Sequence, residues 1–61
     1  MQKFEQLKQT IAQCEEDVRK AEEGNKAAVT RVRKAMQDLK NLAQDIRKEM
    51  LEIRDQGGAK A

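Results

Sequence analysis

Hydrophobic residues recur along the first half of the chain with alternating spacings of three and four positions. They are Phe4, Leu7, Ile11, Cys14, Val18 and Ala21. Because residues three and four positions apart lie on the same side of an α-helix, this pattern predicts an amphipathic helix with a heptad repeat. With Phe4 at heptad position a, the same register continues beyond Gly24. Its later a positions are Val32, Leu39, Ile46 and Ile53, and its later d positions include Ala28, Ala35 and Leu42.

Gly24 and Asn25 separate two stretches that are rich in helix-forming residues. Gly readily takes the left-handed conformation that follows a helix end, and Asn can cap the next helix. Inside a continuous helix, a Gly costs about 1 kcal/mol relative to Ala. The pair therefore indicates a hinge, and the flanking patterns predict helices near residues 2–23 and 26–55.

One continuous helix in a coiled coil is the alternative, because the heptad register crosses the hinge without a break. In a parallel coiled coil, however, position g faces position e of the partner five residues on, which would oppose Asp17 to Glu22. The second helix also has a third hydrophobic column, which consists of Val29, Met36, Ala43 and Met50. A three-column stripe suits a helix that packs against more than one neighbour, so the hairpin is favoured.

The sequence thus predicts an all-α fold, with an antiparallel two-helix hairpin as a single domain of residues 1–56 and a flexible tail of residues 57–61. A chain of 61 residues buries little of its surface, and the single Cys14 cannot form an internal disulfide. Small folds of this kind are commonly stabilised by association. The longer second helix would extend beyond the first and leave three hydrophobic residues for a second subunit, Met50, Leu51 and Ile53. We therefore expect a homodimer that forms a helical bundle.

The composition argues against several classes of function. Charged residues make up 39% of the chain, and His is absent. No apolar run is long enough for a signal peptide or a transmembrane helix, so we expect no membrane partner and a cytoplasmic protein with a reduced thiol. Without a nucleophile–base pair or a Gly-rich phosphate loop, the sequence predicts neither an enzyme nor a metal, cofactor or small-molecule site.

Charge is distributed unevenly along the chain. Residues 1–25 carry four basic and six acidic side chains, whereas residues 26–61 carry nine basic and five acidic ones. One heptad column of the second helix is basic in five successive repeats, at Lys26, Arg33, Lys40, Arg47 and Arg54. This column is either an ordinary solvated face, supported by pairs such as Lys34 with Asp38 and Asp45 with Lys48, or a ridge that contacts DNA phosphates. Base readout is not expected, because aromatic stacking residues and groove-reading combinations are missing.

Two segments carry a more specific signal, KAEEGNKAAVTRVRKA at residues 20–35 and IRKEMLEI at residues 46–53. They resemble the chlamydial linker-histone-like protein family of small bacterial nucleoid proteins, over residues 18–53. The resemblance implies DNA binding and chromosome compaction, with matching basic positions at Lys26, Arg31, Arg33, Lys34, Arg47 and Lys48. Chlamydial members add a long tail rich in Lys and Ala. This chain has one Lys after Arg54 and is similar to shorter, tail-less members.

We therefore expect a non-sequence-specific DNA-binding protein of the bacterial nucleoid that binds the phosphates of duplex DNA. The expected contacts are Lys26, Arg31, Arg33, Lys34, Lys40, Arg47, Lys48 and Arg54. The alternative is a structural module whose helices pair with another helical protein and do not bind nucleic acid.

Overall fold

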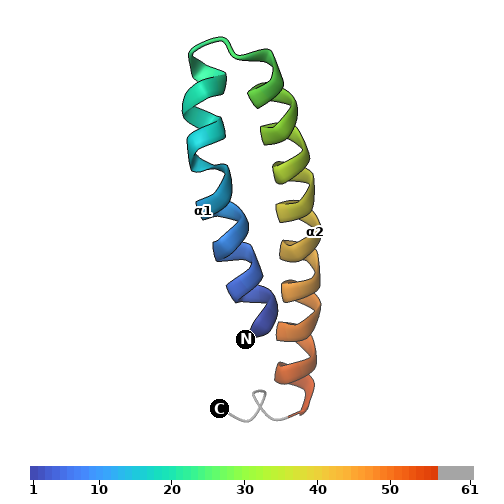
Figure 1. Cartoon of the computed structure of the whole chain (residues 1–61). Helices are drawn as coiled ribbons and strands as arrows, with labels where there is room; N and C mark the ends of the chain where they lie inside the picture. The colour runs from blue at the N-terminus through green and yellow to red at the C-terminus, as the bar shows by residue number, and fades with distance from the viewer. Residues whose placement is uncertain (57–61) are drawn as a thin grey trace.

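The computed structural model describes residues 1–56, which form two α-helices joined by a tight turn (Figure 1). Helix α1 spans Gln2–Glu22 and helix α2 spans Lys26–Gln56. The helices lie side by side and antiparallel, and the hairpin measures 50 × 15 × 15 Å. The predicted all-α hairpin is confirmed, with helix boundaries within one residue of the expected ones, and the structure is not a continuous helix. The predicted flexible tail, residues 57–61, lies outside the described residues.

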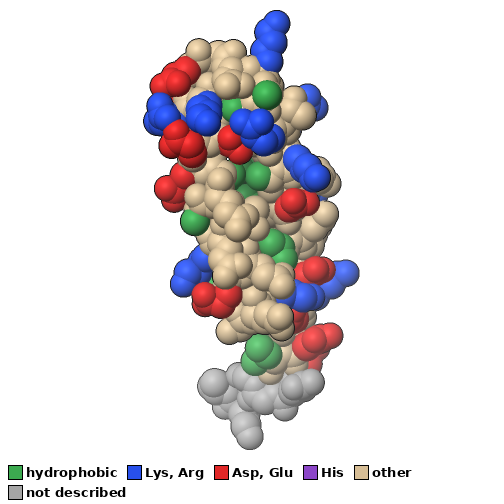
Figure 2. All heavy atoms as spheres, viewed as in Figure 1, with side chains coloured by type: hydrophobic (Ala, Val, Ile, Leu, Met, Phe, Trp, Pro, Cys, Tyr) green, Lys and Arg blue, Asp and Glu red, His purple; other side chains and the backbone are tan. Residues whose placement is uncertain are grey.

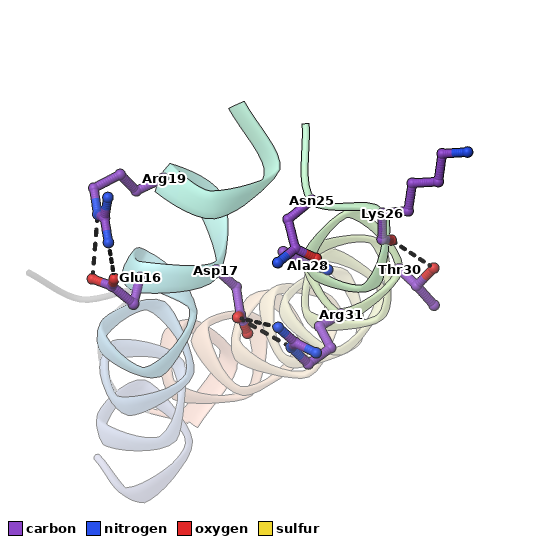
Figure 3. A network of polar contacts seen from close by, with 8 residues as sticks. All are labelled: Glu16, Asp17, Arg19, Asn25, Lys26, Ala28, Thr30 and Arg31. Atoms are coloured by element: carbon purple, nitrogen blue, oxygen red, sulfur yellow. Dashed lines mark hydrogen bonds and ion pairs between the residues drawn. The ribbon is translucent and has the colours of Figure 1, made fainter. Parts of the chain in front are cut away.

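The turn combines a left-handed glycine with a side-chain cap. Gly24 has a φ of 98°, in the region that a β-carbon disfavours. The N–H groups of Gly24 and Asn25 donate to the carbonyl oxygens of Ala21 and Lys20, each at 3.0 Å, and this closes α1 in a Schellman motif. Asn25 Oδ1 then accepts a hydrogen bond from the N–H of Ala28 at 3.0 Å and caps α2 (Figure 3). Gly24 therefore supplies the backbone conformation that ends α1, whereas Asn25 helps to close α1 with its N–H and caps α2 with its side chain.

The hydrophobic seam between the helices is narrow. Within residues 1–56, the only buried hydrophobic residues are Cys14 and Ala28. Half-buried side chains complete the seam, from Leu7 and Ala21 of α1 and from Val32, Ala35, Leu39, Leu42 and Ile46 of α2. We call the residues at one heptad position a column. On α1, only the d column contributes hydrophobic side chains to the seam. The a column of α1, which the sequence pattern placed on the same hydrophobic stripe, stays exposed.

Ion pairs between the helices explain this rotation of α1. Near the turn, Arg31 donates to Asp17 Oδ1 from Nε at 3.1 Å and from Nη2 at 3.0 Å (Figure 3). Near the other end, Lys3 Nζ lies 3.6 Å from a carboxylate oxygen of Asp45 and 3.2 Å from one of Glu49. Lys3 and Asp17 both belong to the g column, so these pairs draw the g side of α1 towards α2 and turn its a side outwards.

Candidate nucleic-acid interface

The basic column of α2 lies on the side of the helix that faces away from α1. Ala28 is fully buried against α1, and a rotation of about 100° per residue carries Lys26 and Arg33 round to the outer side. Figure 3 shows Lys26 pointing away from the hairpin. Members of this column are seven residues apart, which corresponds to about 10 Å along the helix axis, and the column extends over about 42 Å. All five of its side chains are exposed, at Lys26, Arg33, Lys40, Arg47 and Arg54.

Two further lysines, Lys34 and Lys48, lie on the outer side of α2 in a parallel column and are also exposed. A column without charge separates the two, consisting of Thr30, Gln37, Gln44 and Leu51. We name the seven basic residues of these two columns the basic ridge. One acidic residue lies in the same columns, Asp55, and its carboxylate is 3.9 Å from Arg54 Nε. The ridge is therefore a nearly unopposed strip of positive charge.

The remaining six ridge residues form no ion pair within residues 1–56. An ordinary solvated face would be expected to pair Lys34 with Asp38 and Lys48 with Asp45. Instead, Asp45 lies against Lys3 of α1. Asp45 and Glu49 of α2 are thus drawn towards α1, and Lys34 and Lys48 are left without an ion pair inside the described residues.

Arg31 occupies a different place from the other predicted DNA contacts. It lies on the side of the hairpin where α1 and α2 exchange ion pairs, and its guanidinium is held by Asp17. This hydrogen bond lowers the pKa of the Asp17 carboxyl and raises the pKa of Arg31, so both groups stay charged over a wide pH range. The structure therefore brings seven of the eight predicted contacts together and places Arg31 between the helices.

Opposite charges are mixed on other parts of the surface. On α1, Arg19 donates to Glu16 (Figure 3). It also donates to Glu23 at 2.9 Å. Its hydrogen bond lowers the pKa of Glu16. Figure 2 shows a face with Lys or Arg beside Asp or Glu, and hydrophobic side chains mostly in a strip between the helices. Such mixed surfaces present little net charge to a polyanion, in contrast to the outer side of α2.

The predicted oligomer contacts lie where α2 extends past the N-terminus of α1 (Figure 1). Met50, Leu51 and Ile53 are 46%, 50% and 52% exposed. Met50 and Leu51 line a shallow groove of about 350 Å³ together with Ile46, Arg47 and Arg54. The C-terminal end of α2 thus combines hydrophobic and basic side chains.

Sequence reasoning missed a second exposed hydrophobic surface. We name it the apolar face, and its residues are 37% to 46% exposed: Phe4, Ile11 and Val18 of α1, with Val29, Met36 and Met50 of α2. The extra hydrophobic column of α2 was visible in the sequence. The exposure of the α1 column was not, because it depends on ion pairs between the helices.

Comparison with protein families identifies the chain. The family model described as histone H1-like protein Hc1 matches residues 1–56, which include both helices and the whole basic ridge. Comparison with curated proteins and with solved structures gave no match. Within residues 1–56, neither helix has a segment long and apolar enough to cross a membrane. Histone-like proteins of this kind are DNA-binding proteins and not enzymes, and the resemblance seen in the sequence is confirmed. The chain belongs to the histone H1-like protein Hc1 family.

Proposed function

We propose that the protein binds duplex DNA without sequence specificity, as a homodimer in the bacterial nucleoid of the cytoplasm. In this proposal the basic ridge of α2 contacts the phosphates. The observation that carries it is the set of six exposed basic side chains on the outer side of α2 that form no ion pair within residues 1–56. Family membership supports DNA as the anion they bind.

The dimensions of the ridge suit contact with a phosphate backbone. Duplex DNA presents one phosphate charge per roughly 1.7 Å of its axis, so a ridge about 42 Å long meets phosphates wherever it crosses a strand. Lys and Arg side chains are long enough to adjust to this spacing. Contacts of this type fix the position of a protein on DNA and carry no base-sequence information. The only aromatic residue, Phe4, lies on α1, so the ridge offers no base-stacking platform for single strands.

A protein-binding module is the second candidate, and the exposed apolar face favours it. DNA cannot cover this face, because protein–DNA interfaces are polar and rich in positive charge. The apolar face and the basic ridge are distinct surfaces, however, and one protein can use both. The two candidates differ in what they predict for binding to bare duplex DNA.

The test is a salt titration of binding to a duplex of arbitrary sequence. Each phosphate contact that is lost should reduce the slope of log K against log salt concentration by about 0.9. We expect this reduction for Lys34→Gln and for Lys40→Gln. Lys20→Gln on α1 is the matched control, because it makes the same chemical change away from the ridge, and it should keep the slope of the unsubstituted chain.

Two results would contradict the proposal. One is the absence of measurable duplex binding at low salt. The other is an equal effect of all three Lys→Gln substitutions, which would mean that net charge alone, and not the ridge, determines binding. Circular dichroism of each variant checks that helicity is unchanged.

A further inference from the structure

The hairpin buries too little to be a complete fold by itself. Within residues 1–56, the only buried hydrophobic residues are Cys14 and Ala28, whereas the six side chains of the apolar face are exposed to between 37% and 46%. A single small core of this kind seldom gives more than about 3–5 kcal/mol, and here the core is close to its minimum. The apolar face is therefore a surface that requires a protein partner.

The six residues of the apolar face lie on one side of the hairpin, although they come from two helices. The ion pairs from Arg31 to Asp17 and from Lys3 to Asp45 show that the g columns of α1 and α2 meet on one side of the seam. In each helix, the seam residues lie between the g column and the hydrophobic column that belongs to the apolar face. Both columns must therefore lie together on the opposite side.

We propose that a second copy of this chain covers the apolar face, packed face to face with both turns at the same end, so that α1 of each copy lies against α2 of the other. One broad side of the hairpin has a flat outline of roughly 750 Å², from its 50 Å length and 15 Å width, which is the same order of size as the roughly 800 Å² of accessible surface that each partner buries in a standard interface. The product is a four-helix bundle, in which hydrophobic residues of both copies form a shared core.

Charge at the borders of the apolar face selects this orientation. On α1 the bordering column contains Glu15 and Glu22, and on α2 the bordering column is the basic one, with Lys26 and Arg33 nearest the turn. The contact between Asp17 and Arg31 shows which residues of α1 and α2 lie at the same height along the hairpin. With the turns at the same end, Glu15 lies level with Arg33 of the partner copy, and Glu22 lies level with Lys26 of the partner copy. Lys8 and Lys40 are the one like-charged combination along this border.

The opposite orientation, with the turns at opposite ends, would place α2 against α2. The column that borders the apolar face on each α2 is basic, so the five cations of one copy would lie beside the five of the other. It would also leave the protruding ends of α2 far apart. With the turns together, the two protruding ends lie at the same end of the bundle, where Met50 and Ile53 of each copy can approach one another.

The orientation has a consequence for DNA, which rests on the proposed function. When α1 lies against α2 of the partner, the two α2 helices occupy diagonal corners of the bundle. Their outer sides face in opposite directions, and so do the ridge residues that take no part in the border pairs with Glu15 and Glu22, namely Lys34, Lys40, Arg47, Lys48 and Arg54. One dimer can then hold two duplexes and bridge them, whereas the opposite orientation would place both ridges on one side against one duplex.

The first experiment measures dimerisation without DNA, by sedimentation equilibrium. Glu15→Arg should weaken the dimer about ten-fold, equivalent to about 1.4 kcal/mol, because it replaces two attractive pairs per dimer with repulsive ones. Adding Arg33→Glu to the same chain should restore most of the affinity. These residues lie on outer flanks of different helices within one hairpin, so the rescue can arise only between copies. A chain that stays monomeric at all concentrations, or a double variant as weak as Glu15→Arg, would overturn the orientation.

The second experiment measures bridging, by capture of a labelled duplex on an immobilised one. The unsubstituted protein should bind both duplexes, whereas Met36→Glu, which places a charge in the apolar face and leaves the ridge intact, should bind one duplex and capture at least ten-fold less of the second. If the unsubstituted protein dimerises but binds no DNA, the proposed function fails and the dimer stands. If it dimerises and binds DNA but never joins two duplexes, the bridging inference is wrong.

Discussion

Replacing Gly24 by alanine should destabilise the protein, and the sign of the effect tests the hairpin itself. Gly24 has a φ of 98°, and apart from the two neighbouring residues nothing lies within 4 Å of the position that a β-carbon would occupy. The cost is therefore conformational and not steric crowding by neighbours. A left-handed conformation costs an L-residue roughly 1–2 kcal/mol. In a small fold with a marginal core, such a loss is a large share of the free energy of unfolding.

A continuous helix would respond in the opposite direction. There, Gly24→Ala would improve helix propensity and stabilise the chain by about 1 kcal/mol. The two structures thus differ by roughly 2–3 kcal/mol in the effect of one substitution. D-alanine at the same position is the matched control, because its preferred φ is positive. It should be at least as stable as Gly, since it restricts the unfolded chain.

The assay is urea unfolding followed by circular dichroism, with all variants at the same chain concentration, because association shifts apparent stability. We expect a lower midpoint for L-alanine and an equal or higher midpoint for D-alanine. A higher midpoint for L-alanine would refute the turn geometry on which the hairpin depends.

Three further substitutions test the turn and the contact between helices. Asn25→Ala should lower the free energy of unfolding by about 1 kcal/mol in urea unfolding, because the Ala28 N–H loses its acceptor, whereas Asn25→Asp should retain it. Because Arg31 lowers the Asp17 pKa below its ordinary 3.8, the pair stabilises the fold above pH about 4, and this contribution is lost as the pH falls through the folded-state pKa. Asp17→Asn should therefore be less stable at pH 7, and its loss of stability on acidification should be smaller. Arg31→Gln should lower the thermal midpoint while changing the salt slope of DNA binding less than Lys40→Gln; the reverse order would place Arg31 among the phosphate contacts.

Local signals in the sequence were sufficient for the helices and their boundaries. Spacings of three and four residues predicted two amphipathic helices, and Gly24 with Asn25 predicted the break between them. These signals act over a few residues, through backbone preference and capping, so they do not depend on distant parts of the chain. The basic column of α2 was visible for the same reason, since helical periodicity fixes which residues share a side.

The rotation of α1 against α2 could not be predicted from these local patterns. The a and d columns of α1 are similarly hydrophobic, so the pattern did not show that Leu7 and Cys14 would face α2 while Phe4 and Ile11 would not. That choice depends on pairs such as Asp17 with Arg31, which are 14 residues apart in the chain. The same pairs hold the Arg31 side chain against α1 and leave the a column of α1 exposed in the apolar face.

Acetylation of lysines with and without duplex DNA, quantified residue by residue by mass spectrometry, shows which helix lies against the DNA. If the ridge contacts phosphates, DNA should protect the four ridge lysines, Lys26, Lys34, Lys40 and Lys48. Lys3 and Lys20 of α1 should stay as reactive as in the free protein. High salt should remove the protection, because phosphate contacts weaken as salt rises. Equal protection on both helices, or protection confined to α1, would contradict the assignment of DNA binding to the outer side of α2.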